Sequence, residues 1–311
     1  MPLATPEARE QQIARVDQEM HVELDRYEQM AKTTRKRRPL QVDDYRWKDA
    51  RPDLVHPTVK ASLEFVSHVE FPPRLYAQPT LEAADKEGLT SMRRLIESIW
   101  LPEEIQHGEV TRKAAIVYEV VGEEEHDRTL ANIAQSDFHI GRGYNAGKAS
   151  SFIWVQELVT TEYYVAMMHN TEDPVLRRVL GDLASQEMFH HRVAGQFMRA
   201  VATAEDVVQT ICEFKMPGHV TSPELQQRST GWAHELGFDF NRMRRVLGNG
   251  IVELAGYQGL GRVITSELLR NQAPQPWRAV LSVADRIHNP LLNYLEGRVA
   301  ARVAGIKAEA V

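Results

Sequence analysis

The sequence predicts an all-α protein, and three observations support that fold class. Apolar residues recur at helical spacing along most of the 311 residues, and almost no segment shows the alternation of a half-buried strand. The periodic segments are rich in alanine, leucine, glutamate, arginine and methionine, which favour helices. Apolar residues make up 43% and charged residues 26%, which is typical of a globular chain and not of a fibrous or disordered one.

Residues 1–56 are predicted to form an N-terminal helix and a basic irregular segment that pack on the main body. Residues 6–32 have the pattern of a polar amphipathic helix. The basic run Arg35–Arg38 follows, and an irregular proline-containing stretch leads to Pro57. We interpret the basic run as solvated, with a docking site for an acidic protein as the alternative.

The main body, residues 57–311, is predicted to contain four long helices. Prolines mark several of their ends, since proline lacks the N–H group that a helix interior needs. The expected helices span residues 57–70, 88–121, 149–170 and 174–203. A polar, glycine-containing connection over 122–148 is too long for a tight turn. Four helices with one long crossover favour a ferritin-like four-helix bundle.

Further helical patterns follow this bundle in the C-terminal third of the chain. They cover residues 222–236, 239–270 and 277–307, and Gly237, Pro274 and Pro276 separate them. We expect these helices to pad the bundle. The predicted architecture is therefore a ferritin-like four-helix bundle with additional N- and C-terminal helices.

Charge and cysteine content exclude several kinds of partner and site. The 37 Lys and Arg residues against 43 Asp and Glu give a net charge of −6, the wrong sign for a nucleic-acid binder. The single cysteine, Cys212, excludes an internal disulfide framework and a metal site made of several thiolates. No export signal and no run of 18 apolar residues is visible, so we expect a cytoplasmic protein without a membrane span.

Two Glu-x-x-His motifs carry the chemistry of this sequence. Glu104 and His107 are three residues apart, so on a helix both side chains leave the same face. Glu187 and His190 repeat the arrangement on another predicted helix. Two such pairs, with one inward carboxylate from each of two further helices, make a carboxylate-bridged dimetal site. For either pair alone, the alternative is an exposed ion pair.

Two glutamates in apolar surroundings are candidates for the remaining carboxylates. Glu70 precedes Glu104 by 34 residues, and Glu157 precedes Glu187 by 30. A buried glutamate is costly unless it binds a cation or another partner. Four carboxylates and two imidazoles without a thiolate suit iron or manganese, so the sequence predicts two iron ions, with manganese as the alternative.

A third match to the same motif is predicted to have no role in this site. Glu123–His126 has Glu-x-x-His spacing, but it follows Gly122 in a run of polar residues. Twelve histidines in a chain of this length make one accidental match unsurprising. We therefore interpret this match as solvated surface.

At these residues the chain resembles the soluble acyl-carrier-protein desaturases. That family's motif Trp-x-x-Glu-Glu-x-x-His-Gly is matched by Trp100, Glu103, Glu104, His107 and Gly108. Its Gln-Glu-x-x-Thr motif is matched by Gln156, Glu157 and Thr160, and its Glu-x-x-His motif by Glu187 and His190. Met216–His219 is similar to its Met-Pro-Ala-His, and Glu70 followed by prolines resembles its first ligand position. The likeness spans about residues 57–270.

The resemblance implies a homodimeric, ferritin-like enzyme with a non-haem di-iron centre. Such an enzyme uses O2 and two electrons from a reduced ferredoxin to place a cis double bond in an acyl chain carried on acyl carrier protein. The implied ligands are Glu70, Glu104, His107, Glu157, Glu187 and His190, with Glu104 and Glu187 bridging. The resemblance also implies that Thr160 helps to deliver a proton to bound oxygen. The alternative is a helix threonine bonded to its own backbone.

Two departures from the family pattern keep other functions open. Gln186 stands where the family has an aspartate that accepts a hydrogen bond from a ligand histidine, and a neutral amide there favours hydroxylation or another oxygenation. The alternatives are thus a related di-iron oxygenase acting on a carrier-bound or free metabolite, and a metal-binding bundle without catalysis. Pro102, two residues before Glu104, predicts either a kink or the first turn of a restarted helix.

Overall fold

The described part of the chain is almost entirely helical. The computed structural model describes residues 6–33, 39–135, 143–203, 206–207, 209–210, 223–239, 242–243 and 246–247. Within these ranges the only β pairing is one isolated antiparallel bridge between Val55 and Thr171. The all-α class is therefore confirmed for the described residues.

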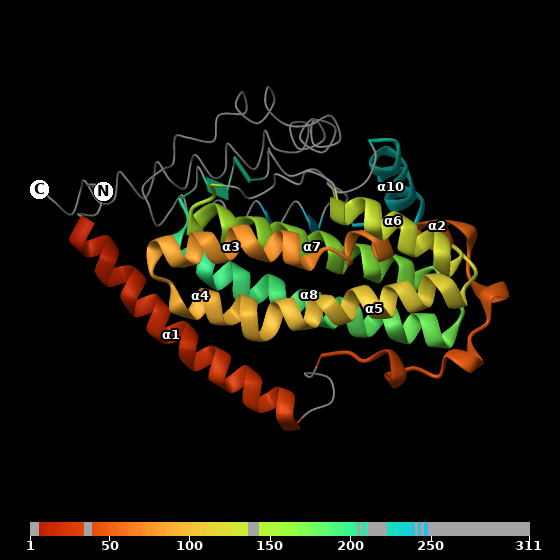
Figure 1. Ribbon diagram of the computed structural model, residues 1–311, viewed down its shortest axis with the longest axis horizontal. Helices are drawn as coiled ribbons and strands as arrows, with labels where there is room; N and C mark the ends of the chain where they lie inside the picture. Colours follow the sequence, from red (N-terminus) through yellow and green to blue (C-terminus); the bar gives the residue numbers. More distant parts are fainter. Residues whose placement is uncertain are drawn as a thin grey trace, which may run out of the picture.

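Nine α-helices and several short helical turns make up the described chain (Figure 1). The α-helices are α1 (Pro6–Thr33), α2 (Pro57–Val69), α3 (Pro73–Glu87), α4 (Thr90–Leu95), α5 (Leu101–Val117), α6 (Glu123–Gln135), α7 (Ala146–His169), α8 (Pro174–Val201) and α10 (Pro223–Glu235). Three 3-10 turns, η2 (Val42–Asp44), η3 (Trp47–Asp49) and η4 (Pro52–Leu54), lie in the irregular stretch before α2. A π-helical turn, η5 (Ile96–Trp100), joins α4 to α5.

Most of the predicted helices are present, but two helices were not predicted. Pro73 begins α3 as a separate helix, with Pro79 inside it, so the prolines that end α2 also start its neighbour. The connection predicted over 122–148 contains α6, whose acidic first turn suits the positive end of a helix. The predicted helix 277–307, most of 239–270, and the basic run Arg35–Arg38 lie outside the described residues.

The packing places α7 at the centre of the molecule. It packs along α8, and α3 also lies against it, while α2 packs on α5. Figure 1 shows α3, α5, α7 and α8 running nearly parallel in one layered group, with α1 crossing its end at an angle. Most side chains of α7 are buried on all sides of the helix, which is expected of a central helix with apolar residues all round.

Helix α1 is attached to this group by one apolar stripe. Val16, Met20, Leu24 and Tyr27 are buried, and their spacing places them on a single helical face. They pack in a cluster with residues of α4 and α8. The N-terminal helix is therefore part of the folded body, although its other face is polar.

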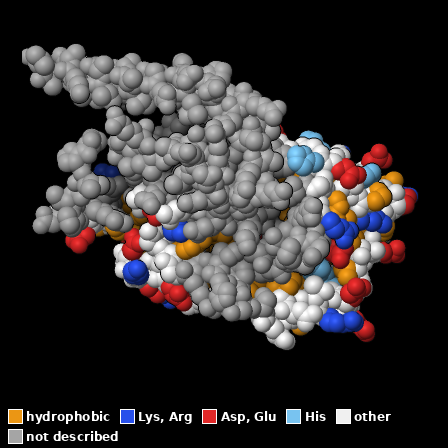
Figure 2. Space-filling view, turned by 90° about the horizontal axis from the view of Figure 1, so that it is seen from above, with side chains coloured by type: hydrophobic (Ala, Val, Ile, Leu, Met, Phe, Trp, Pro, Cys, Tyr) orange, Lys and Arg blue, Asp and Glu red, His pale blue; other side chains and the backbone are white. Residues whose placement is uncertain are grey.

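The described surface mixes both signs of charge. Figure 2 shows acidic and basic side chains interspersed over the face that is not grey. Among the described helices, none combines the length and the apolar character that crossing a bilayer requires.

Asp173 connects three parts of this fold. It is fully buried and caps the N-terminus of α8, where its Oδ1 accepts a hydrogen bond from the Leu176 N–H at 2.6 Å. The same oxygen accepts the hydroxyl proton of Tyr118, just after α5. Its Oδ2 accepts the N–H of Arg51 at 2.7 Å, which holds the irregular N-terminal stretch.

We expect Asp173→Ala to lower the free energy of unfolding by about 2–4 kcal/mol, because it removes a helix cap and leaves two buried donors unpaired. Chemical denaturation of the full chain measures this loss. Asp182→Ala is the matched control on α8: Asp182 is half-buried and accepts one long bond, 3.3 Å from the Tyr45 hydroxyl. Equal losses in both variants would show that Asp173 has no special role.

Candidate metal centre

Six side chains from four helices converge in the interior of the protein. Glu70 ends α2, α5 carries Glu104 and His107, α7 carries Glu157, and α8 carries Glu187 and His190. Each of the six is at most 6% exposed. These are the residues that the sequence predicted to meet, and the structure brings all six together. Their role as metal ligands stays a prediction.

The helix spacing explains how two of the four helices each supply a pair. Residues three apart on α5 or α8 project from one face, so a glutamate and a histidine point inward together. Gly108, next to His107, lets α5 come close to the end of α2. A Cβ atom at that glycine would lie 3.1 Å from the backbone oxygen of Glu70. A larger residue would therefore push Glu70 away from the α5 pair.

The six side chains form two overlapping groups of four. The first contains Glu70, Glu104, His107 and Glu187, and the second contains Glu104, Glu157, Glu187 and His190. Within each group the candidate ligand atoms all lie within 4.8 Å of one another. Glu104 and Glu187 belong to both groups, which is the arrangement that a pair of carboxylate-bridged ions needs.

Several buried polar atoms at this place have no hydrogen-bond partner among the described residues. They are Glu104 Oε1, His107 Nδ1, both carboxylate oxygens of Glu187, and His190 Nδ1. His107 Nδ1 lies 3.1 Å from Glu187 Oε1, and His190 Nδ1 lies 3.0 Å from Glu104 Oε1, but neither contact is aligned as a hydrogen bond. Buried polar atoms are normally satisfied, so these residues fit a site for metal ions.

Each histidine is held by a partner on its far side. His107 Nε2 donates to Gln186 Oε1 at 2.8 Å, and His190 Nε2 donates to Glu103 Oε2 at 2.7 Å. Because both Nε2 atoms carry a proton, the Nδ1 atoms are the ones that face the centre, and each offers a lone pair to a metal ion once its own proton is displaced. The two partners differ in charge, since one is a neutral amide and the other a carboxylate.

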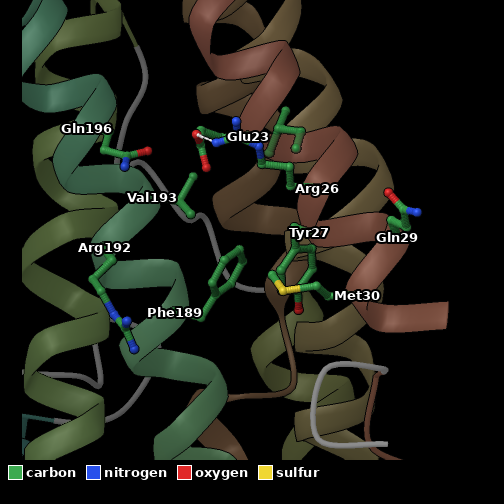
Figure 3. A pocket seen from close by; sticks show the side chains of 10 residues that line it. Glu23, Arg26, Tyr27, Gln29, Met30, Phe189, Arg192, Val193 and Gln196 are labelled. Carbon is green, nitrogen blue, oxygen red and sulfur yellow. Dashed lines mark hydrogen bonds and ion pairs between the residues drawn. The ribbon is translucent and has the colours of Figure 1, made fainter. Parts of the chain in front are cut away.

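Glu103 is itself held by the N-terminal helix. The Tyr27 hydroxyl donates to Glu103 Oε1 at 2.5 Å. The Tyr27 ring stacks on Phe189 of α8, with ring centroids 3.8 Å apart, and Figure 3 shows the two rings side by side in the wall of a pocket of about 550 Å³. A hydrogen-bonded chain therefore runs from α1 through Glu103 to His190.

Neither Glu103 nor Tyr27 was predicted from the sequence to have a role in the centre. A signal for Glu103 was available, because it precedes Glu104 just as Gln186 precedes Glu187. Tyr27 had no such signal, since it lies 76 residues from Glu103 in the chain.

The two single glutamates each receive one hydrogen bond. The Tyr164 hydroxyl donates to Glu70 Oε1 at 2.5 Å, and the Trp100 indole N–H donates to Glu157 Oε1 at 2.9 Å. These donors come from α7 and from the π-helical turn. They orient the two carboxylates and leave the second oxygen of each available.

The electrostatics show how the centre balances its charge when it holds only protons. Burial raises the pKa of Glu70 and of Glu157, and the negative charges of Glu187 and Glu104 raise both pKa values further. Burial lowers the pKa of His107, but Glu104 and Glu187 outweigh it and raise that pKa to about 10. Metal ions entering this centre must therefore displace protons, because ligand atoms bind in their deprotonated form.

Two further sequence interpretations have an outcome in the structure, and a third does not. Thr160 is buried, and its hydroxyl donates to the Gln156 carbonyl at 3.0 Å. This is the bond to its own helix backbone that was the alternative for Thr160. Its role in proton delivery stays a prediction. Pro102 lies in the first turn of α5, but the helix does not restart there, since Trp100 and Leu101 keep helical dihedral angles and the backbone passes through the π-helical turn without a break. Met216–His219 lies outside the described residues.

The interpretation of Glu123–His126 as solvated surface was wrong for the histidine. His126 is completely buried, whereas Glu123 is exposed. His126, Leu130 and Ile133 form the buried stripe of α6. The helical spacing of these three residues was the signal, and the polar residues between them obscured it.

The comparisons with known proteins do not identify a family. No protein-family model matches the chain, and no curated protein is significantly similar to it.

We expect Tyr27→Phe to weaken metal binding at the His190 side, but by less than the about 10- to 100-fold that is typical when the direct partner of a ligand histidine is lost, because Glu103 itself remains. The phenyl ring can keep its stacking on Phe189, while the hydroxyl contact with Glu103 is removed. Stepwise titration of the metal-free chain with Mn²⁺, followed by calorimetry, measures the two binding steps separately.

Tyr163→Phe is the matched control for this variant. Tyr163 is a buried tyrosine whose hydroxyl donates to Ser62 at 3.1 Å, and it does not contact Glu103. We expect its binding isotherm to equal that of the wild-type chain. If Tyr27→Phe also left both steps unchanged, Tyr27 would have no part in the centre.

Proposed function

We propose that this chain is a ferritin-like, O2-dependent oxidoreductase with two metal ions held by Glu70, Glu104, His107, Glu157, Glu187 and His190. The observation that carries the proposal is the pair of overlapping four-residue groups, in which five buried atoms have no hydrogen-bond partner. Ion pairs between these histidines and glutamates balance part of the charge, but they leave both oxygens of Glu187 and both inward imidazole nitrogens without an aligned hydrogen bond.

The donor set supports iron, with manganese as the alternative. Four carboxylates and two imidazoles suit these hard and borderline cations, and neither group of described residues contains a thiolate that would favour zinc or copper. A reduced di-iron pair supplies dioxygen activation and an oxidant for an unactivated C–H bond, which side chains alone do not provide. The protein residues bind the ions, orient the imidazoles through Gln186 and Glu103, and enclose the centre away from solvent.

For the reaction we propose desaturation of an acyl chain carried on acyl carrier protein. Support comes from the likeness of the segments 100–108 and 156–160 to the desaturase motifs and from the convergence of the glutamates and histidines within them. The proposal includes a reduced ferredoxin as electron donor, a homodimeric assembly and a cytoplasmic location. Thr160 is the proposed catalytic residue beside the metal ions.

Gln186 supports a second candidate, a di-iron oxygenase acting on a carrier-bound or free metabolite. His107 donates to the neutral amide of Gln186, whereas His190 donates to the carboxylate of Glu103. A carboxylate partner makes an imidazole a stronger donor to a metal than an amide partner does. The two metal positions are therefore unequal, which favours different oxidation chemistry from that of a site with two carboxylate partners.

Metal content is the first test. We expect anaerobically purified wild-type protein to hold two irons per chain and Glu187→Ala to lose most of this iron, because Glu187 belongs to both groups. Glu162→Ala is the control, since Glu162 is also buried but pairs with Arg242, 3.0 Å away, and belongs to neither group. Elemental analysis gives the outcome, and unchanged iron in Glu187→Ala would remove the ligand assignment.

The reaction is tested with the iron-loaded protein, acyl carrier substrates of several chain lengths, reduced ferredoxin and labelled O2. We expect mass spectrometry of the released chains to show a loss of two hydrogens and no added label. A product that carries labelled oxygen would support the oxygenase instead. Unchanged chains together with two bound irons would leave a metal-binding bundle without catalysis and would contradict both oxidative proposals.

A further inference from the structure

A second pair of buried histidines lies outside the metal centre. His68 is in α2 and His126 is in α6, and both side chains are at most 4% exposed. Their ring centroids are 4.8 Å apart, and the ring planes differ by 32°. Two imidazoles from different helices therefore face one another in a space that solvent does not reach.

The hydrogen bonds of Ser67 determine which nitrogen of His126 carries the proton. The Ser67 hydroxyl donates its proton to the Glu64 carbonyl at 2.7 Å. Its oxygen lies 2.9 Å from His126 Nε2 and must accept there, because the hydroxyl has one proton only. His126 thus carries its proton on Nε2, and its Nδ1 has a bare lone pair.

That lone pair and one nitrogen of His68 have no hydrogen-bond partner. Among the described residues, eight buried side-chain atoms are without one, and five of them belong to the candidate metal centre. Two of the others are His126 Nδ1 and His68 Nε2, and the last is the Glu162 oxygen that lies 3.0 Å from Arg242. The histidine pair and the candidate metal centre therefore both contain buried nitrogen atoms without a hydrogen-bond partner, which is the observation that supports metal binding at the centre.

We propose that His68 and His126 bind a single metal ion that takes imidazole ligands, Cu⁺ or Zn²⁺. No group of three or more acidic, histidine and cysteine ligands found among the described residues includes this pair, so the donors that the described protein provides here are two imidazoles. Imidazole suits both metals, and a site without a negative charge favours the ion of lower charge, Cu⁺. Zn²⁺ would need further ligands, and no solvent reaches this space to supply them, which also favours Cu⁺.

The bound ion would join α6 to the end of α2, two residues before Glu70. His126 is the only residue of the pair on the crossover helix, and Ser67 holds its ring in the orientation that a ligand needs. This site is separate from the proposed oxidative function, because none of its residues belongs to the six-residue centre.

Cu⁺ titration of the full-length, metal-free chain against a coloured chelator tests the site. Cu⁺ binds poorly to carboxylates but well to thiolates, so the titration uses the Cys212→Ser background, in which we expect His126→Gln to lower the number of bound Cu⁺ ions by one. His169→Gln is the control, since His169 is an exposed histidine in the last turn of α7, and we expect it to bind as the wild type does. A parallel Zn²⁺ titration in the Glu187→Ala background decides between the two metals.

Ser67→Ala keeps both imidazoles and removes only the hydroxyl that orients His126. We expect it to weaken binding about 10- to 100-fold without changing the number of ions bound. The X-ray absorption spectrum of the metal-loaded wild type should show nitrogen ligands at about 2.0 Å with imidazole scattering. Equal binding of both metals by the wild type and by His126→Gln would overturn the proposal, whatever iron analysis shows for the main centre.

Discussion

Four carboxylates and two imidazoles share one solvent-free volume, and this concentration of charge constrains the structure around it. Isolated ions in such a place would cost many kilocalories per mole, so the charge must be balanced by protons or by metal ions. With protons alone, burial raises the pKa values of Glu70 and Glu157, and the histidines are drawn toward the charged form. Metal ions would balance the same charge and would also engage the nitrogens and oxygens that no hydrogen bond uses.

The two halves of the centre are alike in backbone and unequal in chemistry. Glu104 with His107 and Glu187 with His190 have the same spacing on helices that pack in one group, so the ligand geometry repeats. The residue before each paired glutamate points to the histidine of the other helix, but one is Gln186 and the other Glu103. Glu103 in turn depends on the hydroxyl of Tyr27, so the N-terminal helix influences one half of the centre and not the other.

The sequence predicted what short-range geometry determines. A glutamate and a histidine three residues apart must share a helical face, and a glutamate among apolar residues must find a partner, so the six converging residues were predictable. Tyr27 was not, because its contact with Glu103 depends on how α1 crosses α4 and α8. Helix α3 was not predicted, because Pro72 and Pro73 indicate only that one helix ends. The same two prolines are compatible with an irregular segment or with a new helix that begins at Pro73. The ferritin-like arrangement itself stays a prediction.

The three Glu-x-x-His matches of this chain have identical spacing but different surroundings. The motif alone therefore could not predict which glutamates and histidines are buried. In two of them both residues are buried and face a second such pair across the helix group. In the third only His126 is buried, because α6 buries a narrow stripe in which His126 contacts Ser67 and His68 of α2, and Glu123 stays in solvent. The spacing of two residues along a helix determines whether their side chains share a face, and packing against a neighbouring helix determines which of these side chains is buried. His126 therefore pairs with His68 of α2 instead of with its own glutamate, which converts a carboxylate motif into a site made of two imidazoles.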